Sequence, residues 1–189
     1  YTFDLNQFTH QALHELNGEG SSSGPALEGN HIVISERIQF GEQKHTMVTL
    51  YDFEKHAELG EYIFPYEIAQ NILLKDEKIY SELWNRDNNE PSVIGVIDLL
   101  TGQFEVVETS VGVDAYATDG QYFAISVTKG ESNTVQLFSL QQQELQRISK
   151  LPLIKERLVK PRFTDEGTLV VNGEGDDRAM YLIRFDESE

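Results

Sequence analysis

Residues 95–127 read GVIDLLTGQFEVVETSVGVDAYATDGQYFAISV, and this stretch decides the fold. Apolar and polar side chains alternate on both sides of two turn signatures, DLLTGQ at 98–103 and DGQ at 119–121. Alternation with a period of two residues is typical of β-strands, and turns containing Asp and Gly join antiparallel neighbours. The stretch therefore predicts a series of antiparallel strands connected by short turns.

The same pattern recurs along the chain. An apolar run ends in an acidic or small polar residue in YTFDL, VTLYDF, GVIDLL, VQLFSL and YLIRFD. The equivalent positions are spaced by 48, 46, 41 and 47 residues, and they are Asp4, Asp52, Asp98, Ser139 and Asp186. A strand repeat of this length is typical of the blades of a β-propeller and not of helical solenoids.

A second landmark repeats in the same phase. Polar turns introduce an apolar run at Gly29, Glu77, Gly120 and Gly167, with spacings of 48, 43 and 47 residues. We therefore expect an all-β β-propeller fold, built of four-stranded antiparallel blades of about 45 residues each. Within a blade the strands are named a to d in chain order, and the polar turn joins a to b.

The strands can be assigned to blades on this scheme. One full blade has strands at 68–74, 78–84, 92–98 and 104–109, and the next has strands at 113–118, 122–128, 134–140 and 144–149. An earlier blade has strands b to d at 31–36, 47–53 and 59–64, preceded by a flexible Gly/Ser-rich loop at 17–30 that leads into a weak strand a. Strands a to c of a last blade lie at 158–163, 168–172 and 179–185, and residues 1–5 and 9–16 are strands c and d of a first one.

The assignment gives seventeen strands, one more than four blades of four. Two architectures satisfy it. A small four-bladed ring would let the N-terminal strand d pair with the C-terminal blade and hide its edge, and an arc of a larger propeller would leave the two ends apart. In both cases residues 1–189 form a single propeller domain or part of one.

The central stretch resembles the blades of YVTN/TolB/quinoprotein-like propellers. That type places an x-D-x-x-T/S-G-x turn between its outer strands, matched here by Asp98, Thr101 and Gly102, and a D-G-x turn between its inner strands, matched by Asp119 and Gly120. The resemblance implies the architecture and no particular activity, because propellers host many unrelated functions.

Composition limits the partners. The chain has 32 acidic against 15 basic residues and a formal charge of −17, which disfavours nucleic acid and anionic membrane surfaces as partners. Its longest apolar runs have the length of a strand, so we expect no direct insertion into a membrane. Basic proteins, polyamines and divalent cations are compatible with the charge.

The sequence contains no cysteine, which excludes disulfides, thiol nucleophiles and thiolate metal sites. The compartment stays open on this evidence alone. The chain opens at Tyr1 without a Met, as expected where a leader or anchor has been removed, and we favour an extracytoplasmic or cell-surface location.

The candidate binding site lies on the loops. In a propeller the b–c and d–a loops share one face of the ring, where loops vary on a rigid scaffold. The b–c loops of this chain are acidic, beginning with Glu42, and the GEGDD segment has carboxylates spaced for one Ca²⁺ ion, although we expect no obligatory cofactor and no metal site. The residues that we predict to bind a ligand are Trp84, Arg86, Asp87, Glu90, Glu131, Glu174, Asp176 and Asp177.

No catalytic signature is present, since HExxH, GxSxG and phosphate-binding glycine loops are all missing from the sequence. The first hypothesis is a noncatalytic binding or scaffold module of an exported or surface-displayed bacterial protein, which binds a protein or polymer ligand on its acidic loop face or completes a larger propeller. Two alternatives stay open. One is a propeller glycoside hydrolase or lyase that uses paired carboxylates near the central channel, and the other is an extracytoplasmic sensor domain of a membrane protein.

Overall fold

The structure is a computed structural model of the chain. It describes residues 2–4, 9–12, 24–86, 92–107, 115–129, 132–141, 144–150, 156–164, 166–174 and 179–184. Within these ranges the chain forms seventeen β-strands and no helix, so the predicted all-β fold and the strand number are confirmed. Nothing in the same ranges is a helix of the length and hydrophobicity needed to cross a membrane.

Three blades are four-stranded antiparallel sheets in which strands consecutive in the chain pair with each other. Blade 1 contains β3 (Ala26–Glu28), β4 (His31–Phe40), β5 (Gln43–Asp52) and β6 (Ala57–Phe64). Blade 2 contains β7 (Ile68–Lys75), β8 (Lys78–Trp84), β9 (Val93–Asp98) and β10 (Phe104–Val107). Blade 3 contains β11 (Ala115–Thr118), β12 (Tyr122–Lys129), β13 (Ser132–Gln141) and β14 (Glu144–Lys150).

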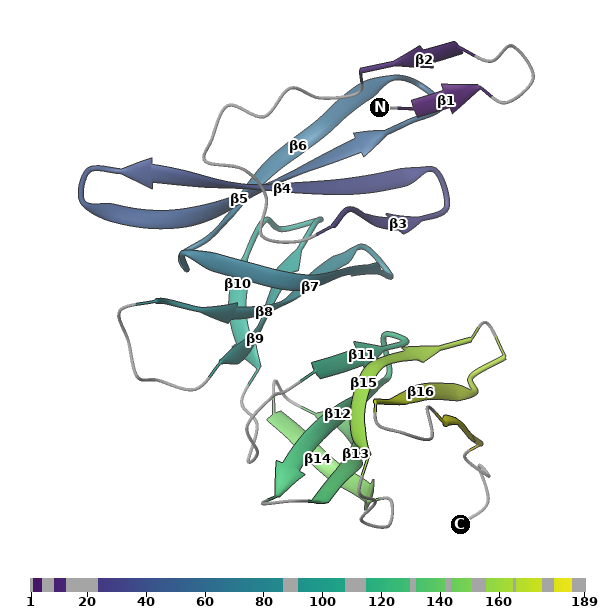
Figure 1. The fold of residues 1–189 in the computed structure, drawn as a ribbon. Coiled ribbons are helices and arrows are strands. Elements are labelled where there is room, and N and C mark those ends of the chain that lie inside the picture. Colours follow the sequence, from purple (N-terminus) through teal and green to yellow (C-terminus); the bar gives the residue numbers. More distant parts are fainter. Residues whose placement is uncertain are drawn as a thin grey trace.

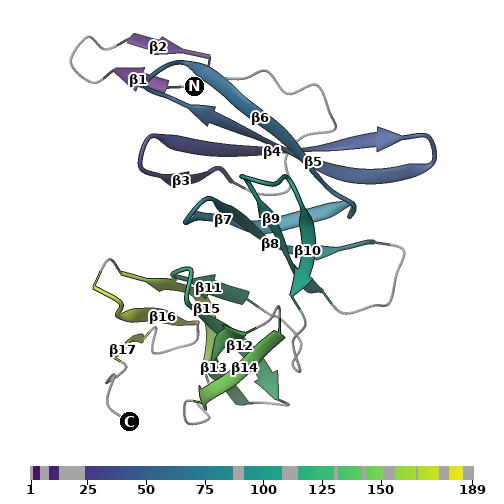
Figure 2. The ribbon, with the colours of Figure 1, turned by 180° about the vertical axis from the view of Figure 1, so that it is seen from behind.

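The two ends of the chain form smaller sheets. The C-terminal blade 4 has three strands, β15 (Arg157–Phe163), β16 (Leu169–Glu174) and β17 (Met180–Ile183), and the N-terminal strands β1 (Thr2–Asp4) and β2 (Thr9–Gln11) form a pair. Among the described residues β1 and β2 pair only with each other, and β17 pairs only with β16. Both views show the N-terminal pair at one end of the molecule, near β6, and blade 4 at the other end (Figure 1, Figure 2). Of the two expected architectures, the structure therefore has the open arc and not the closed four-bladed ring.

Strand β8 shows why the blades stack. Its residues alternate between two cores, with Ile79 and Leu83 packed among the side chains shared with blade 1 and Tyr80 packed toward blade 3. The rings of Tyr80 and Phe123 meet edge to face at a centroid distance of 5.5 Å, an arrangement that aromatic pairs favour. Strand β8 is therefore buried on both faces. A third core cluster, which includes Leu137 and Leu169, joins blades 3 and 4.

The turn signatures found in the sequence have the expected geometry. The Oδ1 atom of Asp98 accepts hydrogen bonds from the backbone N–H of Leu100 (3.0 Å) and Thr101 (2.9 Å) and from the Thr101 hydroxyl (3.0 Å). Gly102 follows with φ of +69°, a conformation that glycine adopts without strain. The repeat spacing therefore marks the end of strand c, where an acidic side chain closes the c–d turn.

Blade 1 departs from the prediction in two places. The hairpin of β4 and β5 runs four residues further than the strand b expected at 31–36, because the alternation of polar and apolar side chains continues to Phe40. The segment expected as a loop at 17–30 contains strand β3, which is strand a of the blade, and the turn at Gly29 that follows it. The rest of the expected loop lies outside the described residues.

Candidate functional site

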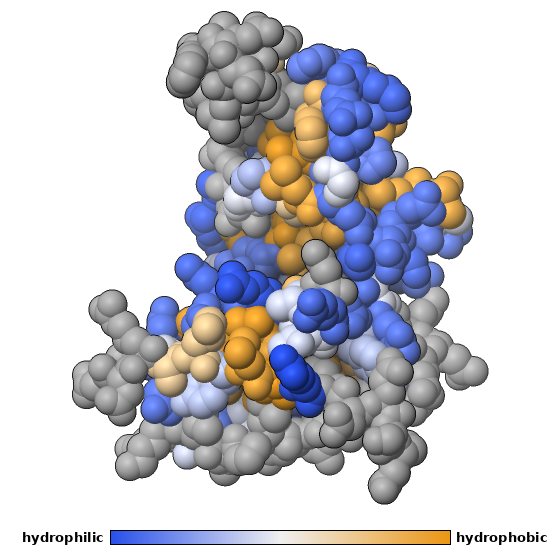
Figure 3. All heavy atoms as spheres, turned by 90° about the vertical axis from the view of Figure 1, so that its right-hand side faces the viewer, coloured by the Kyte–Doolittle hydropathy of each residue, from blue (hydrophilic) through white to orange (hydrophobic). Residues whose placement is uncertain are grey.

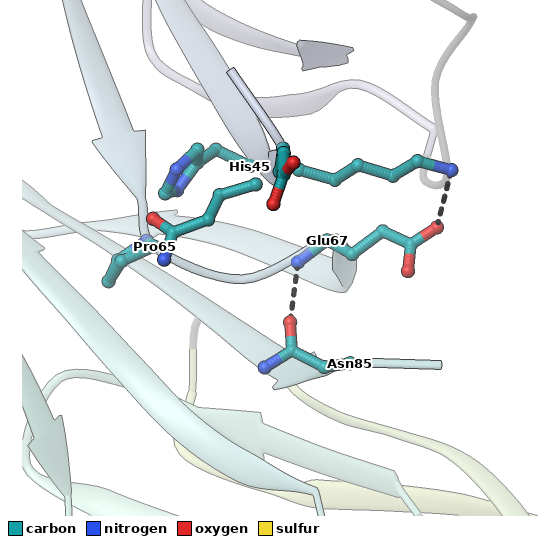
Figure 4. A pocket seen from close by; sticks show the side chains of 7 residues that line it. His45, Pro65, Glu67 and Asn85 are labelled. Carbon is teal, nitrogen blue, oxygen red and sulfur yellow. Dashed lines mark hydrogen bonds and ion pairs between the residues drawn. The ribbon is translucent and has the colours of Figure 1, made fainter. Parts of the chain in front are cut away.

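A pocket of about 490 Å³ opens where blade 1 meets blade 2. It is lined by the b–c turn of blade 1 and the start of β5, by the connection from β6 to β7, and by the end of β8. These are b–c and d–a segments, so the pocket lies on the loop face that the sequence predicted. In Figure 4, His45 and Pro65 lie on one side of the pocket and Glu67 and Asn85 on the other. The complete lining is Glu42, Gln43, Lys44, His45, Pro65, Glu67 and Asn85.

The connection between the two blades is held in place by side chains from both of them. The buried Thr46 hydroxyl of β5 donates to the backbone carbonyls of Tyr66 (3.2 Å) and Glu67 (3.1 Å). The Asn85 side-chain oxygen accepts a hydrogen bond of 2.9 Å from the Glu67 backbone N–H. Because these bonds fix the backbone on both sides, the Glu67 side chain projects from a rigid support.

Glu67 is the most unusual group of the pocket. Its side chain is only 8% exposed, and its Oε1 atom lies 3.5 Å from Arg86 Nε and 3.7 Å from Lys44 Nζ. Both separations are too long for good hydrogen bonds, and within the described part of the chain Oε1 accepts none. The two cations are themselves 54% and 43% exposed. The pocket thus presents a buried acceptor behind two partly exposed cationic side chains.

Two ring nitrogens near the pocket are also buried. Trp84 Nε1 and His45 Nδ1 have no hydrogen-bond partner among the described residues. The His45 ring lies 5.7 Å from the ring of Phe40, whose side chain is exposed to solvent. The loop face between blades 1 and 2 therefore combines aromatic surface with polar atoms that a ligand could engage.

The structure describes three of the eight residues predicted to bind a ligand. Trp84 is half-buried at the end of β8, and Arg86 follows it beside the pocket. Glu174 is exposed at the end of β16, away from this pocket and in register with Arg157. The other predicted positions lie outside the described residues, and they are Asp87, Glu90, Glu131, Asp176 and Asp177.

Sequence reasoning missed Glu67, Lys44 and His45. Glu67 stands in PYEIAQ, directly before the strand expected at 68–74, and no sequence motif distinguishes it from the other carboxylates of an acidic chain. Lys44 and His45 were included in a b–c loop, whereas they belong to strand β5.

A second hollow follows the inner strands of the arc. Strands β3, β7, β11 and β15 are the first strands of their blades and neighbour one another in that order. A cavity of about 430 Å³ lies along them, with Asn71 and Lys160 at bulges of β7 and β15 where φ is +52° and +50°. Tyr116 donates a hydrogen bond of 2.9 Å to the Asn71 carbonyl, and burial raises the pKa of this phenol well above 10.0.

The lining of this cavity bears on the enzyme hypothesis. Its described residues include no Asp or Glu. The nearby buried Glu82 is engaged, because its Oε2 accepts a hydrogen bond of 2.8 Å from the Asn71 amide. The lining of this cavity therefore contributes no carboxylate of the kind that a glycosidase mechanism uses.

The a–b turns form a third hollow of about 510 Å³ at the opposite end of the inner strands. Lys75 Nζ lies 3.1 Å from Glu28 Oε1, and the hydrogen bond to Glu28 is the main reason why the pKa of Lys75 is raised. Asp119 accepts hydrogen bonds from the backbone of its own turn, from Gln121 (3.0 Å) and Tyr122 (2.7 Å). These carboxylates hold turns and neighbouring blades together. Across the described residues, no three His, Asp or Glu side chains gather as metal ligands.

Comparison with known proteins supports the fold and goes no further. No protein-family model and no curated protein matches the sequence. Among solved structures, the chain is similar to the β-propeller domain of the trilobed protease from Pyrococcus furiosus, with 14% identity and a TM-score of 0.57. It is also similar to the computationally designed Ika4 protein (14%, TM-score 0.55) and to the Dos1 propeller (11%, TM-score 0.52).

The extent of these matches differs. The alignment covers 88% of this chain and 55% of the Pyrococcus propeller domain, 94% of this chain and all of Ika4, and 79% of this chain and 42% of Dos1. By fold the chain is a β-propeller module, as its repeats predicted. It spans little more than half the length of the Pyrococcus propeller domain.

Proposed function

We propose that this chain is a noncatalytic binding module that holds a cationic group of a protein or polymer ligand in the pocket between blades 1 and 2. The buried Glu67 carboxylate carries the proposal. A buried charge is costly unless hydrogen bonds compensate it, and its Oε1 atom accepts none from the described residues. A lysine ammonium or an arginine guanidinium of a ligand would donate that bond with charge assistance.

The two cations beside Glu67 do not oppose this assignment. Lys44 and Arg86 have long side chains that are about half exposed, so an incoming cation can replace them at a modest cost in buried contacts. The formal charge of −17 attracts cations and repels anions over a distance of about 10 Å at moderate salt. The field of the whole chain thus favours a basic ligand over an acidic one.

The wider setting is also part of the proposal. We place the module in an exported or surface-displayed bacterial protein, a setting with which the absence of cysteine is compatible. Binding of Ca²⁺ by the GEGDD segment stays a prediction, since only Glu174 and the preceding Gly173 of that region are described.

The test uses Trp84 as its reporter, because it is the single tryptophan of the sequence and directly precedes Asn85, which lines the pocket. The 189-residue chain is titrated with an octalysine peptide while tryptophan fluorescence is followed at several salt concentrations. We expect saturable binding that weakens with salt, and we expect Glu67→Gln to weaken it by at least about tenfold. An octaglutamate peptide should not bind.

The matched control is Glu105→Gln, which removes the same charge from an exposed position of β10 outside the pocket. It should bind octalysine as the unchanged chain does. The proposal is wrong if both variants bind with equal affinity, because binding would then depend on net charge alone. It is also wrong if octaglutamate binds and octalysine does not.

A further inference from the structure

The face of blade 1 that points away from blade 2 carries exposed apolar side chains around two buried polar ones, Glu36 and Thr49. Val33 and Val48 pack toward blade 2, so the residues that alternate with them face the other way. On that face Leu27 is 61% exposed, Phe40 is 56% exposed and Ile63 is 42% exposed. We call this surface the blade 1 end face. Its half-buried members are Ile32, Ile34, Ile38 and Met47.

Blade 4 has a matching surface at the other end of the arc. Leu169 and Val171 pack toward blade 3, and Val170 between them is on the opposite side, where it is buried in register with the exposed Leu182. Leu182 is 63% exposed and Met180 is 60% exposed. We call this surface the blade 4 end face. Exposed apolar side chains that lie next to each other on a sheet mark a surface that packs against something else.

Hydrophobic side chains can be seen at the surface in both halves of the molecule. In the side view of Figure 3, they reach the surface in the upper half, which holds blades 1 and 2, and in the lower half, which holds blades 3 and 4. Elsewhere in the molecule, equivalent faces are covered, as the buried contact of blades 2 and 3 shows.

The two end faces carry opposite charges. Glu61 is exposed on the blade 1 end face, in register with Thr49, and Glu58 is exposed next to Tyr51, whose hydroxyl donates to it over 3.3 Å. On the blade 4 end face, Arg162 is exposed in register with Val170, and the alternation of β17 places exposed Arg184 on the same side.

Two further charges lie on the blade 4 end face. Arg157 is in register with Glu174, and these two balance each other. Its net charge therefore comes from Arg162 and Arg184, which are two of only seven arginines in an acidic chain. Opposite charges around apolar centres are the arrangement that orients two surfaces toward each other.

The edge of blade 4 is open as well. In blades 1 to 3 the third strand pairs with a fourth, whereas β17 has no such neighbour among the described residues. An unpaired strand edge beside an exposed apolar face is a site where another chain adds.

We propose that the blade 4 end face of one copy of this chain packs on the blade 1 end face of a second copy. The two end faces are different patches of one chain, so a single contact between two copies would leave one blade 1 end face and one blade 4 end face uncovered. Two copies that join head to tail make this contact twice. All four end faces are then covered, and the two arcs close into a ring. This places the free edge of β17 beside the N-terminal strands of the partner.

The test measures the mass of the 189-residue chain by sedimentation velocity across a range of concentrations. We expect a species of twice the monomer mass of 21.5 kDa. The double variant Arg162→Glu with Arg184→Glu and the double variant Glu58→Arg with Glu61→Arg should each dissociate at least about tenfold more readily. A one-to-one mixture of the two variants should recover the dimer, because the reversed charges are complementary again.

A control variant and a folding measurement distinguish loss of association from misfolding. Glu105→Arg reverses a charge on β10 away from both end faces and should dimerise like the unchanged chain, and thermal unfolding of the monomers should show that every variant is folded. The proposal is overturned if the unchanged chain stays a monomer at the highest concentration. It is also overturned if the folded double variants dimerise normally, or if their mixture remains monomeric.

Discussion

Blade 2 and blade 4 are built from the same repeat but have different surroundings. Strand β8 of blade 2 is buried without interruption from Ile79 to Leu83, because blades 1 and 3 cover its two sides. Strand β17 of blade 4 alternates between exposed and half-buried residues, and its edge has no described neighbour. Blade 2 is packed between two neighbouring blades, whereas blade 4 packs against one blade among the described residues. The burial of a strand on both sides therefore depends on the adjoining blades.

The largest expected effect comes from a cavity in blade 2. Leu83→Ala removes a fully buried side chain between blades 1 and 2 and should lower the free energy of unfolding by about 2–5 kcal/mol. Urea unfolding followed by circular dichroism measures this change. A loss below about 1 kcal/mol would mean that the contact between these blades contributes little to stability.

A smaller effect concerns pH and the c–d turn of blade 2. Hydrogen bonds from Thr101 hold the pKa of Asp98 below its ordinary 3.8, so this carboxylate stabilises the folded chain above that pH and the contribution is lost as pH falls through the lowered value. Asp52 follows the same rule in blade 1, chiefly because the Lys55 ammonium donates to it. Asp98→Asn should therefore show a smaller fall in melting temperature between about pH 5 and about pH 3 than the unchanged chain.

Blade 3 of the same chain provides the control for this pH effect. Blade 3 has Ser139 at the equivalent position and lacks the carboxylate. Replacing Ser139 by Ala should leave the acid sensitivity of the chain unchanged. An equal fall in melting temperature for Asp98→Asn and the unchanged chain would show that the turn carboxylate does not contribute to acid unfolding.

The smallest effect on stability is expected at blade 4. Leu182→Ser replaces an apolar side chain that is largely exposed in a single copy, so the free energy of unfolding of the monomer should change by no more than about 0.5 kcal/mol. Its effect should appear instead in the dissociation constant of the dimer. A large loss of monomer stability would show that this face is already covered within one chain.

Much of the fold could be predicted from the sequence, because the repeat is a property of side-chain alternation. Strand β8 was predicted with its observed bounds, since the charged turn before Lys78 and the end of the apolar run at Trp84 are both local signals. Strand β3 was hidden in a Gly/Ser-rich segment, because its order depends on pairing with β4 and not on its own composition.

The candidate site was predicted only in its location. The loop face follows from the order of strands, and Arg86 lies beside the pocket as expected. Glu67 could not be identified as its central group, because its burial results from Thr46 and Asn85, which lie on neighbouring blades. The sequence also could not decide between an open arc and a closed ring, since the number of strands is compatible with both.

One measurement tests most directly that the chain is an open arc and that a second copy completes the ring. The chain has no cysteine, so Glu54→Cys in blade 1 and Glu166→Cys in blade 4 provide unique and exposed positions for spin labels. Pulsed dipolar spectroscopy on the doubly labelled chain, diluted with excess unlabelled chain, should give a long distance, whereas a mixture of the two singly labelled chains should give a short one. A short distance within the diluted, doubly labelled chain would contradict the open arc, because it would mean that blade 4 closes on blade 1 of the same copy.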